Sequence, residues 1–223
     1  MEIYRSATKF LLGHTDPVLL QEWLVDHQDI TGIVTVGRSN VGKSSLINAI
    51  FGNNTARVSK TPGRTQEINF FHYFLKSEKN QEYPDGFISN PLYLFDLPGH
   101  GYADVPIKLK NNWQELLDVF FANLPPGVLI LNIQDVRHPM QTSDKLLLDY
   151  LKTFNHSMIM AFNKLDKLKT QKERAQLKNN MPTLLKGAKA PNQIFFVSAE
   201  KRTGLKELET SIINHSLDWI RLN

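Results

Sequence analysis

The chain of 223 residues contains no cysteine. Disulfide bonds, thiolate zinc sites and cysteine nucleophiles are therefore excluded, and the absence suits a reducing cytosol. No apolar run approaches the roughly 18 residues that a membrane-spanning helix needs. The first residues also lack the apolar run and cleavage site of a secretory signal peptide. We therefore expect a cytoplasmic protein that does not engage a membrane.

The composition is that of a soluble globular protein, with 41% hydrophobic and 22% charged residues. Lysine and arginine exceed aspartate and glutamate, which gives a formal net charge of +4. An excess of this sign suits a polyanionic partner, although many proteins of similar charge bind no nucleic acid.

From about residue 30 onward, apolar β-rich runs alternate with helix-like stretches. This alternation predicts an α/β fold with a mostly parallel, six-stranded sheet and helices on both faces. The predicted strands are 30–36, 68–75, 92–95, 128–133, 158–162 and 194–197, and the predicted helices are 43–51, 107–122, 143–154, 171–181 and 205–220. We expect one domain over 30–223, on which an N-terminal extension, 1–29, packs through a short helix or strand at 18–25.

The segment GRSNVGKS at 37–44 matches the phosphate-binding P-loop pattern and lies between a predicted strand and a predicted helix. Its glycines let the backbone wrap around phosphates, and the helix N-terminus adds positive potential. Lys43 would reach the β- and γ-phosphates, Ser44 would bind Mg²⁺, and Ser45 would contact the α-phosphate. The alternative is a glycine-rich turn that matches the pattern by chance. Such a turn would need neither a strand before it nor a helix after it, so this context favours a P-loop.

The sequence NKLD at 163–166 follows an apolar strand and indicates guanine rather than adenine. Asp166 could accept hydrogen bonds from guanine N1–H and the exocyclic amine, whereas adenine would leave this carboxylate buried and unpaired. Asn163 would hold neighbouring loops together, and the stem of Lys164 would cover the base. Taken alone, the four residues could also be a helix N-cap with solvated charges.

Two further segments end predicted strands. In Asp96-Leu97-Pro98-Gly99, Asp96 would hold Mg²⁺ through water and the Gly99 amide would sense the γ-phosphate. In Val197-Ser198-Ala199, a backbone amide could donate to guanine O6. Because α/β proteins bind ligands at the carboxyl ends of their strands, four such motifs in this order predict a GTP-binding protein.

Five segments are distinctive in combination: GRSNVGKSS at 37–45, SKTPGRTQEINFF at 59–71, DLPGHGYA at 96–103, DVRHPM at 135–140 and SAEKRTGL at 198–205. Together they resemble the EngB family of bacterial GTPases, within the TrmE–Era–EngA–EngB–Septin-like group. The resemblance implies a Ras-like P-loop NTPase fold, binding of GTP and Mg²⁺, and a role in assembling the large ribosomal subunit. It also implies a requirement for normal cell division and septation.

The resemblance places Thr65 at the switch I position that reaches Mg²⁺ only when GTP is bound. Dependence of this segment on the γ-phosphate would supply the two-state element of a switch. A threonine after Pro62-Gly63 would equally suit an ordinary turn.

His100 is a departure from the family pattern, which more often has tyrosine after the glycine of DLPG. A histidine here could orient the attacking water or stabilise charge, or it could simply face solvent. In related P-loop GTPases that lack a glutamine at the position of His100, an asparagine at the position of Asn40 helps to bind K⁺ beside the phosphates, where the ion would stand in for an arginine finger; Asn40 could also simply hydrogen-bond within its loop. We expect slow intrinsic hydrolysis that a partner accelerates, with Lys43, Thr65, Gly99 and His100 as the catalytic set.

The residues predicted to bind GTP are Gly37, Arg38, Ser39, Asn40, Val41, Gly42, Lys43, Ser44, Ser45, Gly63, Arg64, Thr65, Gln66, Asp96, Leu97, Pro98, Gly99, Asn163, Lys164, Leu165, Asp166, Val197, Ser198 and Ala199. The predicted Mg²⁺ ligands are Ser44, Thr65 and, through water, Asp96.

Basic residues outnumber acidic ones in the C-terminal half, between residues 164 and 206. Lys172, Lys178, Lys186 and Lys189 have no nucleotide role, so this surface could bind ribosomal RNA of the large subunit precursor, or it could be an ordinary solvated face. We expect a monomer. The alternative functions are a phosphoryl transferase, which the NKLD motif disfavours, and a GTP-dependent scaffold for division proteins in which hydrolysis is incidental.

Overall fold

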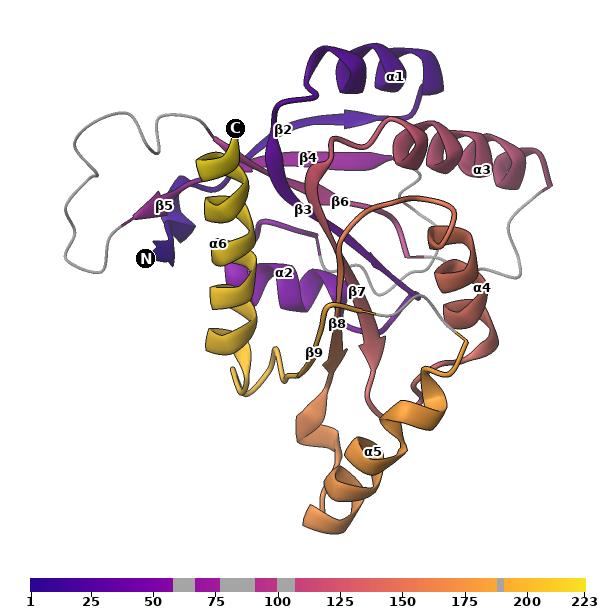
Figure 1. The fold of residues 1–223 in the computed structure, drawn as a ribbon, viewed down its shortest axis with the longest axis vertical. Coiled ribbons are helices and arrows are strands. Elements are labelled where there is room, and N and C mark those ends of the chain that lie inside the picture. Colours follow the sequence, from indigo (N-terminus) through magenta and orange to yellow (C-terminus); the bar gives the residue numbers. More distant parts are fainter. Residues whose placement is uncertain (58–66, 77–90, 100–106, 188–190) are drawn as a thin grey trace.

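The computed structural model describes residues 1–57, 67–76, 91–99, 107–187 and 191–223. Within them, seven strands form one sheet in the order β2-β4-β6-β3-β7-β8-β9 (Figure 1). The strands are β2 (Lys9–His14), β3 (Thr31–Gly37), β4 (Ile68–Tyr73), β6 (Leu92–Asp96), β7 (Gly127–Asp135), β8 (Met158–Asn163) and β9 (Gln193–Phe196). The predicted α/β class with a mostly parallel sheet is confirmed, but the predicted count of six strands is wrong.

The direction of the strands fixes where loops can meet. Strands β6, β3, β7, β8 and β9 pair in parallel, whereas β4 is antiparallel to β6, and β2 is antiparallel to β4. The carboxyl ends of the five parallel strands therefore lie at one edge of the sheet, where open α/β sheets bind ligands.

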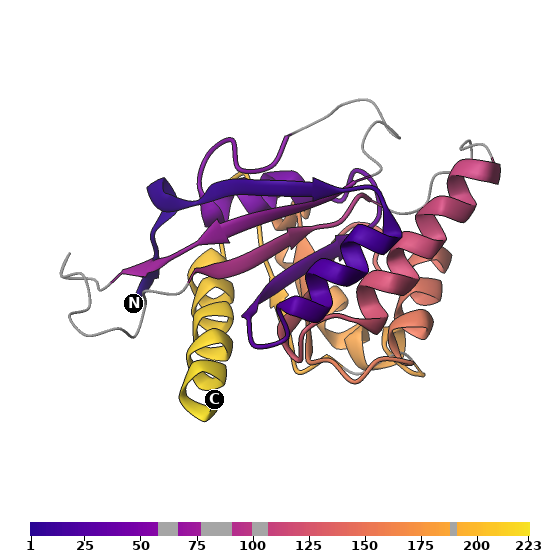
Figure 2. The ribbon, with the colours of Figure 1, turned by 90° about the horizontal axis from the view of Figure 1, so that it is seen from above.

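The extra strand comes from the N-terminal residues. β2 pairs with the edge of β4, with an irregular register between Phe10 and Leu12. Helix α1 (Pro17–Asp26) then begins at Asp16, whose carboxylate accepts from the Val18 and Leu19 amides at 2.8 and 3.1 Å. α1 lies beside α3 (Ile107–Ala122) in both ribbon views (Figures 1 and 2). The end of the predicted strand 68–75 lies outside this sheet. There, β5 (Leu75–Lys76) pairs with β1 (Glu2–Ile3) to form a separate two-stranded ribbon.

Helices cover both faces of the sheet, as predicted. One core cluster joins the sheet to α2 (Lys43–Phe51) and α6 (Leu205–Leu222). The other joins it to α1, α3, α4 (Thr142–Leu151) and α5 (Gln171–Leu184). Successive residues of a strand point to opposite faces, so Ile33 belongs to the first cluster and Val34 to the second. Among the helices of the described residues, none is both long and apolar enough to cross a membrane.

Candidate nucleotide site

The P-loop connects the carboxyl end of β3 to α2. Its last glycine, Gly42, has φ +90°, a left-handed conformation that favours glycine, and it stands at the N-cap of α2. No described side chain caps this helix start, whereas α5 begins with a reciprocal pair formed by Thr170 and Glu173. The first amides of a helix lack intrahelical acceptors, so the start of α2 can bind an anion such as a phosphate.

Asn163 bridges the P-loop to the loop that follows β9. Its Nδ2 donates to the carbonyls of Val41 and Gly42 at 3.1 and 3.2 Å, and its Oδ1 accepts from the Ala199 amide at 3.1 Å. A Cβ on Gly42 would come within 2.5 Å of Asn163 Nδ2, so only glycine permits this approach. Asn163 therefore joins two loops, the role that the sequence predicted for it.

Lys43 and Asp96 form an ion pair at the point where β6 ends beside the P-loop. Both side chains are largely buried, with 10% and 11% of their surfaces exposed. The Thr35 hydroxyl also donates to Asp96 Oδ1 at 3.0 Å. Three residues further on, Gly99 approaches so closely that a Cβ would lie 2.9 Å from the backbone nitrogen of Ser39. The Asp96–Gly99 segment therefore lies directly against the P-loop.

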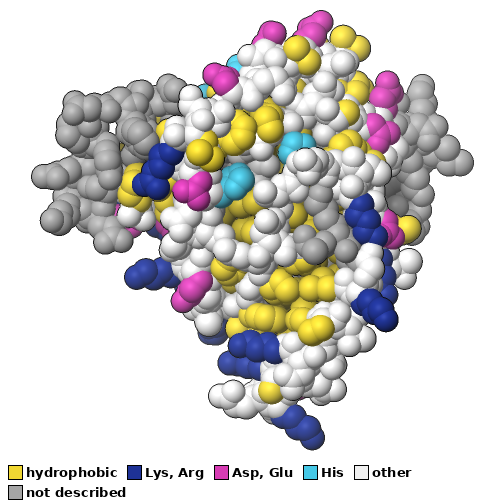
Figure 3. All heavy atoms as spheres, viewed as in Figure 1, with side chains coloured by type: hydrophobic (Ala, Val, Ile, Leu, Met, Phe, Trp, Pro, Cys, Tyr) yellow, Lys and Arg dark blue, Asp and Glu magenta, His cyan; other side chains and the backbone are white. Residues whose placement is uncertain are grey.

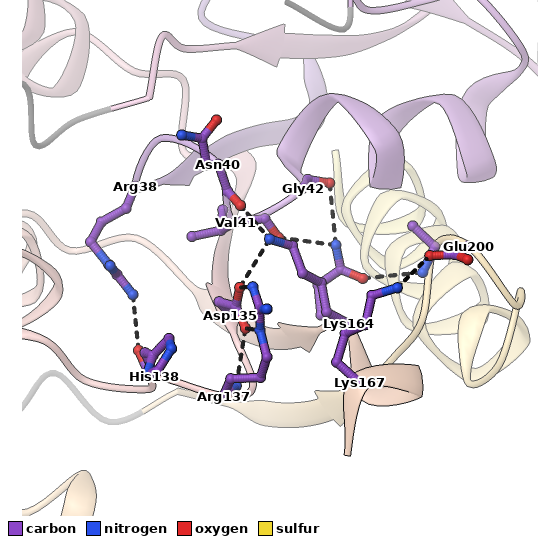
Figure 4. Close-up of polar contacts among 12 residues, drawn as sticks. Arg38, Asn40, Val41, Gly42, Asp135, Arg137, His138, Lys164, Lys167 and Glu200 are labelled. Atoms are coloured by element: carbon purple, nitrogen blue, oxygen red, sulfur yellow. Dashed lines mark hydrogen bonds and ion pairs between the residues drawn. The ribbon is translucent and has the colours of Figure 1, made fainter. Parts of the chain in front are cut away.

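Lys164 reaches from the end of β8 to two neighbouring loops (Figure 4). Its ammonium donates to the carbonyl of Asn40 and forms an ion pair with Asp135 Oδ2 at 2.9 Å. Asp135 also accepts from Arg137, through the backbone amide at 3.0 Å and the guanidinium at 2.9 and 2.6 Å. Although burial acts to raise it, the hydrogen bonds from Arg137 and Lys164 hold the pKa of Asp135 well below its usual range. This carboxylate therefore stays ionised beside Lys164 throughout the physiological pH range.

Asp166 faces the loop after β9. The Ser198 hydroxyl donates to its Oδ1 at 2.5 Å, and the Lys167 ammonium lies 3.0 Å from its Oδ2. Although burial acts to raise it, these two contacts hold the pKa of Asp166 below its usual range. Asp166 is therefore an acceptor at neutral pH, as pairing with guanine N1–H and an amine requires.

The three amides of 197–199, among which the sequence predicted a donor to guanine O6, all donate within the protein, the Val197 amide to the Phe162 carbonyl at 2.9 Å. The Ser198 amide donates to the Thr203 carbonyl at 3.0 Å, and the Ala199 amide donates to Asn163. Upstream, the Val197 carbonyl accepts from the Leu165 amide at 2.9 Å. These bonds place 163–166 and 197–199 side by side.

Arg38 differs from the other P-loop residues, because its side chain lies against α4. Its Nε donates to both carboxylate oxygens of Asp144 at 2.9 Å, and its terminal nitrogen donates to the His138 carbonyl at 2.9 Å. Asp144 is fully buried and also accepts from the Gln141 amide at 3.0 Å. Burial raises the pKa of Asp144 against the opposing effect of Arg38. Arg38, predicted among the GTP-binding residues of the P-loop, thus has a structural partner for its guanidinium.

Two of the three predicted Mg²⁺ ligands, Ser44 and Asp96, lie within the described residues. No group of three histidine, cysteine or acidic side chains suited to a metal occurs among them. Mg²⁺ at nucleotide sites needs no such group, because one or two oxygen ligands and the substrate phosphates suffice. Ser44, in the first turn of α2, supplies a hydroxyl oxygen and Asp96 supplies a carboxylate beside the P-loop. This donor set fits Mg²⁺.

Several predicted site residues lie outside the described residues: Gly63, Arg64, Thr65, Gln66 and His100. Conversely, the sequence interpretation assigned no role to Thr35, Asp135, Arg137 or Asp144. Asp135 ends an apolar strand just as Asp96 and Asn163 do, so the same signal could have identified it. Nothing in the sequence near Arg38 indicates its pairing with Asp144, 106 residues away.

Comparisons with known proteins agree with this geometry. A family model described as "50S ribosome-binding GTPase" matches residues 32–164. The probable GTP-binding protein EngB of Laribacter hongkongensis is 37% identical over 182 residues, covering 81% of this chain and 75% of that protein. EngB of Rickettsia felis is 31% identical over 212 residues, covering 95% of this chain and 89% of that protein.

Solved structures share the fold. Era, in complex with MgGDPNP and nucleotides 1506–1542 of 16S ribosomal RNA, has a TM-score of 0.62 at 22% identity. That match covers 85% of this chain and 57% of the Era chain. A probable GTP-binding protein engB has a TM-score of 0.55 at 20% identity, covering 86% of this chain and 99% of that chain.

The P-loop, the ion-paired Lys43 and the bridged loops at the strand ends define a nucleotide-binding protein of the P-loop GTPase class. Within that class, the chain belongs to the EngB family of GTP-binding proteins.

Proposed function

We propose that this chain is a slow, Mg²⁺-dependent GTPase that acts as a switch in assembly of the large ribosomal subunit. The observation that carries the proposal is that Asn163 joins the P-loop to the loop after β9, with the Lys43–Asp96 ion pair at the P-loop and Asp166 bonded to Ser198. The family description, a GTPase that binds the 50S subunit, directs the proposal to the large subunit. We further propose a cytoplasmic monomer whose loss disturbs cell division and septation, as the EngB resemblance implies.

In this proposal the P-loop residues 37–45 hold the phosphates and Lys43 exchanges its contact with Asp96 for the β- and γ-phosphates. Ser44, Thr65 and Asp96 would hold Mg²⁺, which neutralises phosphate charge when bound. Asp166 would accept from guanine, with the backbone of 197–199 beside it. The Gly99 amide and His100 would sense the γ-phosphate and orient water.

The proposed ribosomal surface is the basic face around α5. Lys167, Lys169, Lys172, Lys178, Lys186, Lys201 and Lys206 are exposed, whereas Lys189 lies outside the described residues. Lysine and arginine side chains lie around the lower end of the molecule, where α5 is located (Figures 1 and 3). Cations that contact RNA phosphates supply affinity without sequence readout, and that affinity falls with salt.

We expect the protein to cosediment with large ribosomal subunits when loaded with a non-hydrolysable GTP analogue, and more weakly when loaded with GDP. Replacing Lys172 and Lys186 with alanine should lower the slope of log affinity against log salt by about 2, one for each lost phosphate contact. The matched control removes Lys9 and Lys145, two exposed lysines elsewhere, and should leave the slope unchanged. Equal binding in both nucleotide states would favour the division scaffold over the ribosomal switch.

A second prediction concerns Asn40, whose backbone is left-handed with φ +63° and whose carbonyl accepts from Lys164. Asparagine tolerates this conformation, and because Asn40 is exposed its side chain can reach the proposed K⁺ ion. We expect GTP hydrolysis to be about tenfold faster in KCl than in NaCl, because the ion would stabilise transition-state charge. Asn40→Asp, which keeps an oxygen ligand, should retain K⁺ dependence, and Asn40→Ala should lose it. Equal rates in both salts for the wild-type protein would contradict a K⁺ site.

A further inference from the structure

Asp135 is a largely buried carboxylate with no part in the proposed phosphate or guanine chemistry. Only 8% of its side-chain surface is exposed, at the carboxyl end of β7. Its two oxygens accept from the Arg137 backbone, the Arg137 guanidinium and the Lys164 ammonium. A buried carboxylate held by three donors keeps one orientation, because any rotation would break hydrogen bonds that compensate its buried charge.

The Lys164 side chain spans the space between the guanine loop and the P-loop. Its backbone is left-handed, with φ +68°, and its side chain is 23% exposed. Its ammonium ends between Asp135 and the Asn40 carbonyl, as the close-up shows (Figure 4). The backbones beside it are also joined, because the Val136 amide donates to the Asn163 carbonyl at 2.9 Å. Asp135 thus fixes the far end of a long side chain that would otherwise rotate freely.

We infer that Asp135 is a positioning residue for the nucleotide: it holds the Lys164 ammonium against the P-loop, and so keeps the lysine stem beside the bound guanine. The inference rests on the proposed guanine site. A lysine side chain has many rotamers, and ordering it on binding lowers affinity. With Asp135 present, this ordering is complete before the nucleotide arrives, which lowers the cost of binding.

The test is the rate of GDP release in Asp135→Asn, measured with a fluorescent GDP analogue by stopped flow. The amide keeps the shape of the carboxylate but loses its charge, so we expect release about tenfold faster. The preference for GTP over ATP should stay as in the wild-type protein, because Asp166 is untouched. A merely structural role would lower the unfolding midpoint without this selective change in release.

A double-mutant cycle with Lys164→Met identifies the route of the effect. If Asp135 acts through Lys164, Asp135→Asn should change release less than twofold once Lys164 is methionine. A full tenfold effect in that background would overturn the inference. Asp149→Asn is the control, since it makes the same change at an exposed carboxylate that is paired with Lys152 and has no contact with Lys164. It should release GDP within twofold of the wild-type rate.

Asp135→Glu provides a second test in case the Asp135→Asn protein folds poorly. It keeps the charge but moves the carboxylate by one methylene, so release should be severalfold faster. If folded Asp135→Glu or Asp135→Asn released GDP at the wild-type rate, the inference about Asp135 would be overturned. The proposed function would be unaffected by that result. Failure of the wild-type protein to bind guanine nucleotides would overturn the proposed function together with the inference.

Discussion

Replacing Asp166 with asparagine is expected to weaken GTP binding by roughly 10²–10³-fold and to create affinity for xanthosine triphosphate. The carboxylate can accept from both guanine N1–H and the exocyclic amine. The asparagine amide would keep one acceptor and turn a donor toward the guanine amine. Losing one charge-assisted bond, weakening the other to a neutral one and setting two donors against each other costs about 3–4 kcal/mol in all, which corresponds to that change in affinity. Xanthine has a carbonyl at this position, so it would accept from the new amide.

Calorimetry with GTP, xanthosine triphosphate and ATP measures the three affinities, and so shows whether the preference changes from guanine to xanthine. The matched control is Asp149→Asn, which removes the same charge from an exposed residue paired with Lys152 and should leave all three affinities unchanged. Ser198→Ala removes the hydroxyl that donates to Asp166, and should weaken GTP binding without admitting xanthine. If Asp166→Asn still prefers GTP, Asp166 does not recognise the base.

Arg38→Ala is expected to lower the free energy of unfolding by about 3 kcal/mol, the order of loss when one partner of a buried ion pair is removed. Asp144 is fully buried, and both of its oxygens accept from the Arg38 Nε. Without Arg38, an ionised Asp144 would keep only part of its hydrogen bonding. Urea unfolding at neutral pH measures the loss. Arg221→Ala, which breaks an exposed pair with Asp218, should cost less than about 1 kcal/mol.

The decrease in the free energy of unfolding caused by Arg38→Ala should depend on pH. Burial raises the native pKa of Asp144 above its unfolded value, so the native state binds the proton more tightly and stability falls as pH rises through that window. Arg38 opposes this effect in the wild-type protein. Without it the native pKa rises further, and the difference between the two proteins should be smaller at pH 5 than at pH 7.5. A difference that is absent at both pH values would contradict a stabilising role for the pair.

Local patterns predicted the parallel part of this fold well. Helix α2 was predicted at the residues where it is observed, because a P-loop must be followed by a helix start and Gly52 ends the apolar pattern. The strand β2 was missed because Lys9–His14 shows no clean alternation and lies half-exposed at the sheet edge. Its pairing partner, β4, begins more than fifty residues later. No local pattern encodes such a pairing.

In the candidate site too, the sequence predicted what depends on local residue patterns and missed what depends on tertiary packing. Asn163 and Asp166 were predicted because their chemistry toward guanine follows from residue type and spacing. The Arg38–Asp144 pair depends on where α4 packs, which is a tertiary property, so residue type alone could not predict the partner of the Arg38 side chain. The sequence shows Asp135 as a carboxylate at the end of a strand. Its pairing with Lys164 depends on β7 and β8 being neighbours in the sheet, which the sequence pattern does not specify.

The order of the strands also has a consequence for the chain as it leaves the ribosome. The P-loop precedes most of its supports in the chain: the central strand β3 needs the later strands β6 and β7 as its neighbours, and Thr31 pairs with Gly127. The groups that hold the loop come later still, since Asp144, Asn163 and Ala199 are added in turn. Because contacts between distant residues must wait for both partners, a nascent chain ending before about residue 200 would carry the phosphate loop without its supports. Competence to bind nucleotide would therefore arise only after the loop that follows β9 has been added.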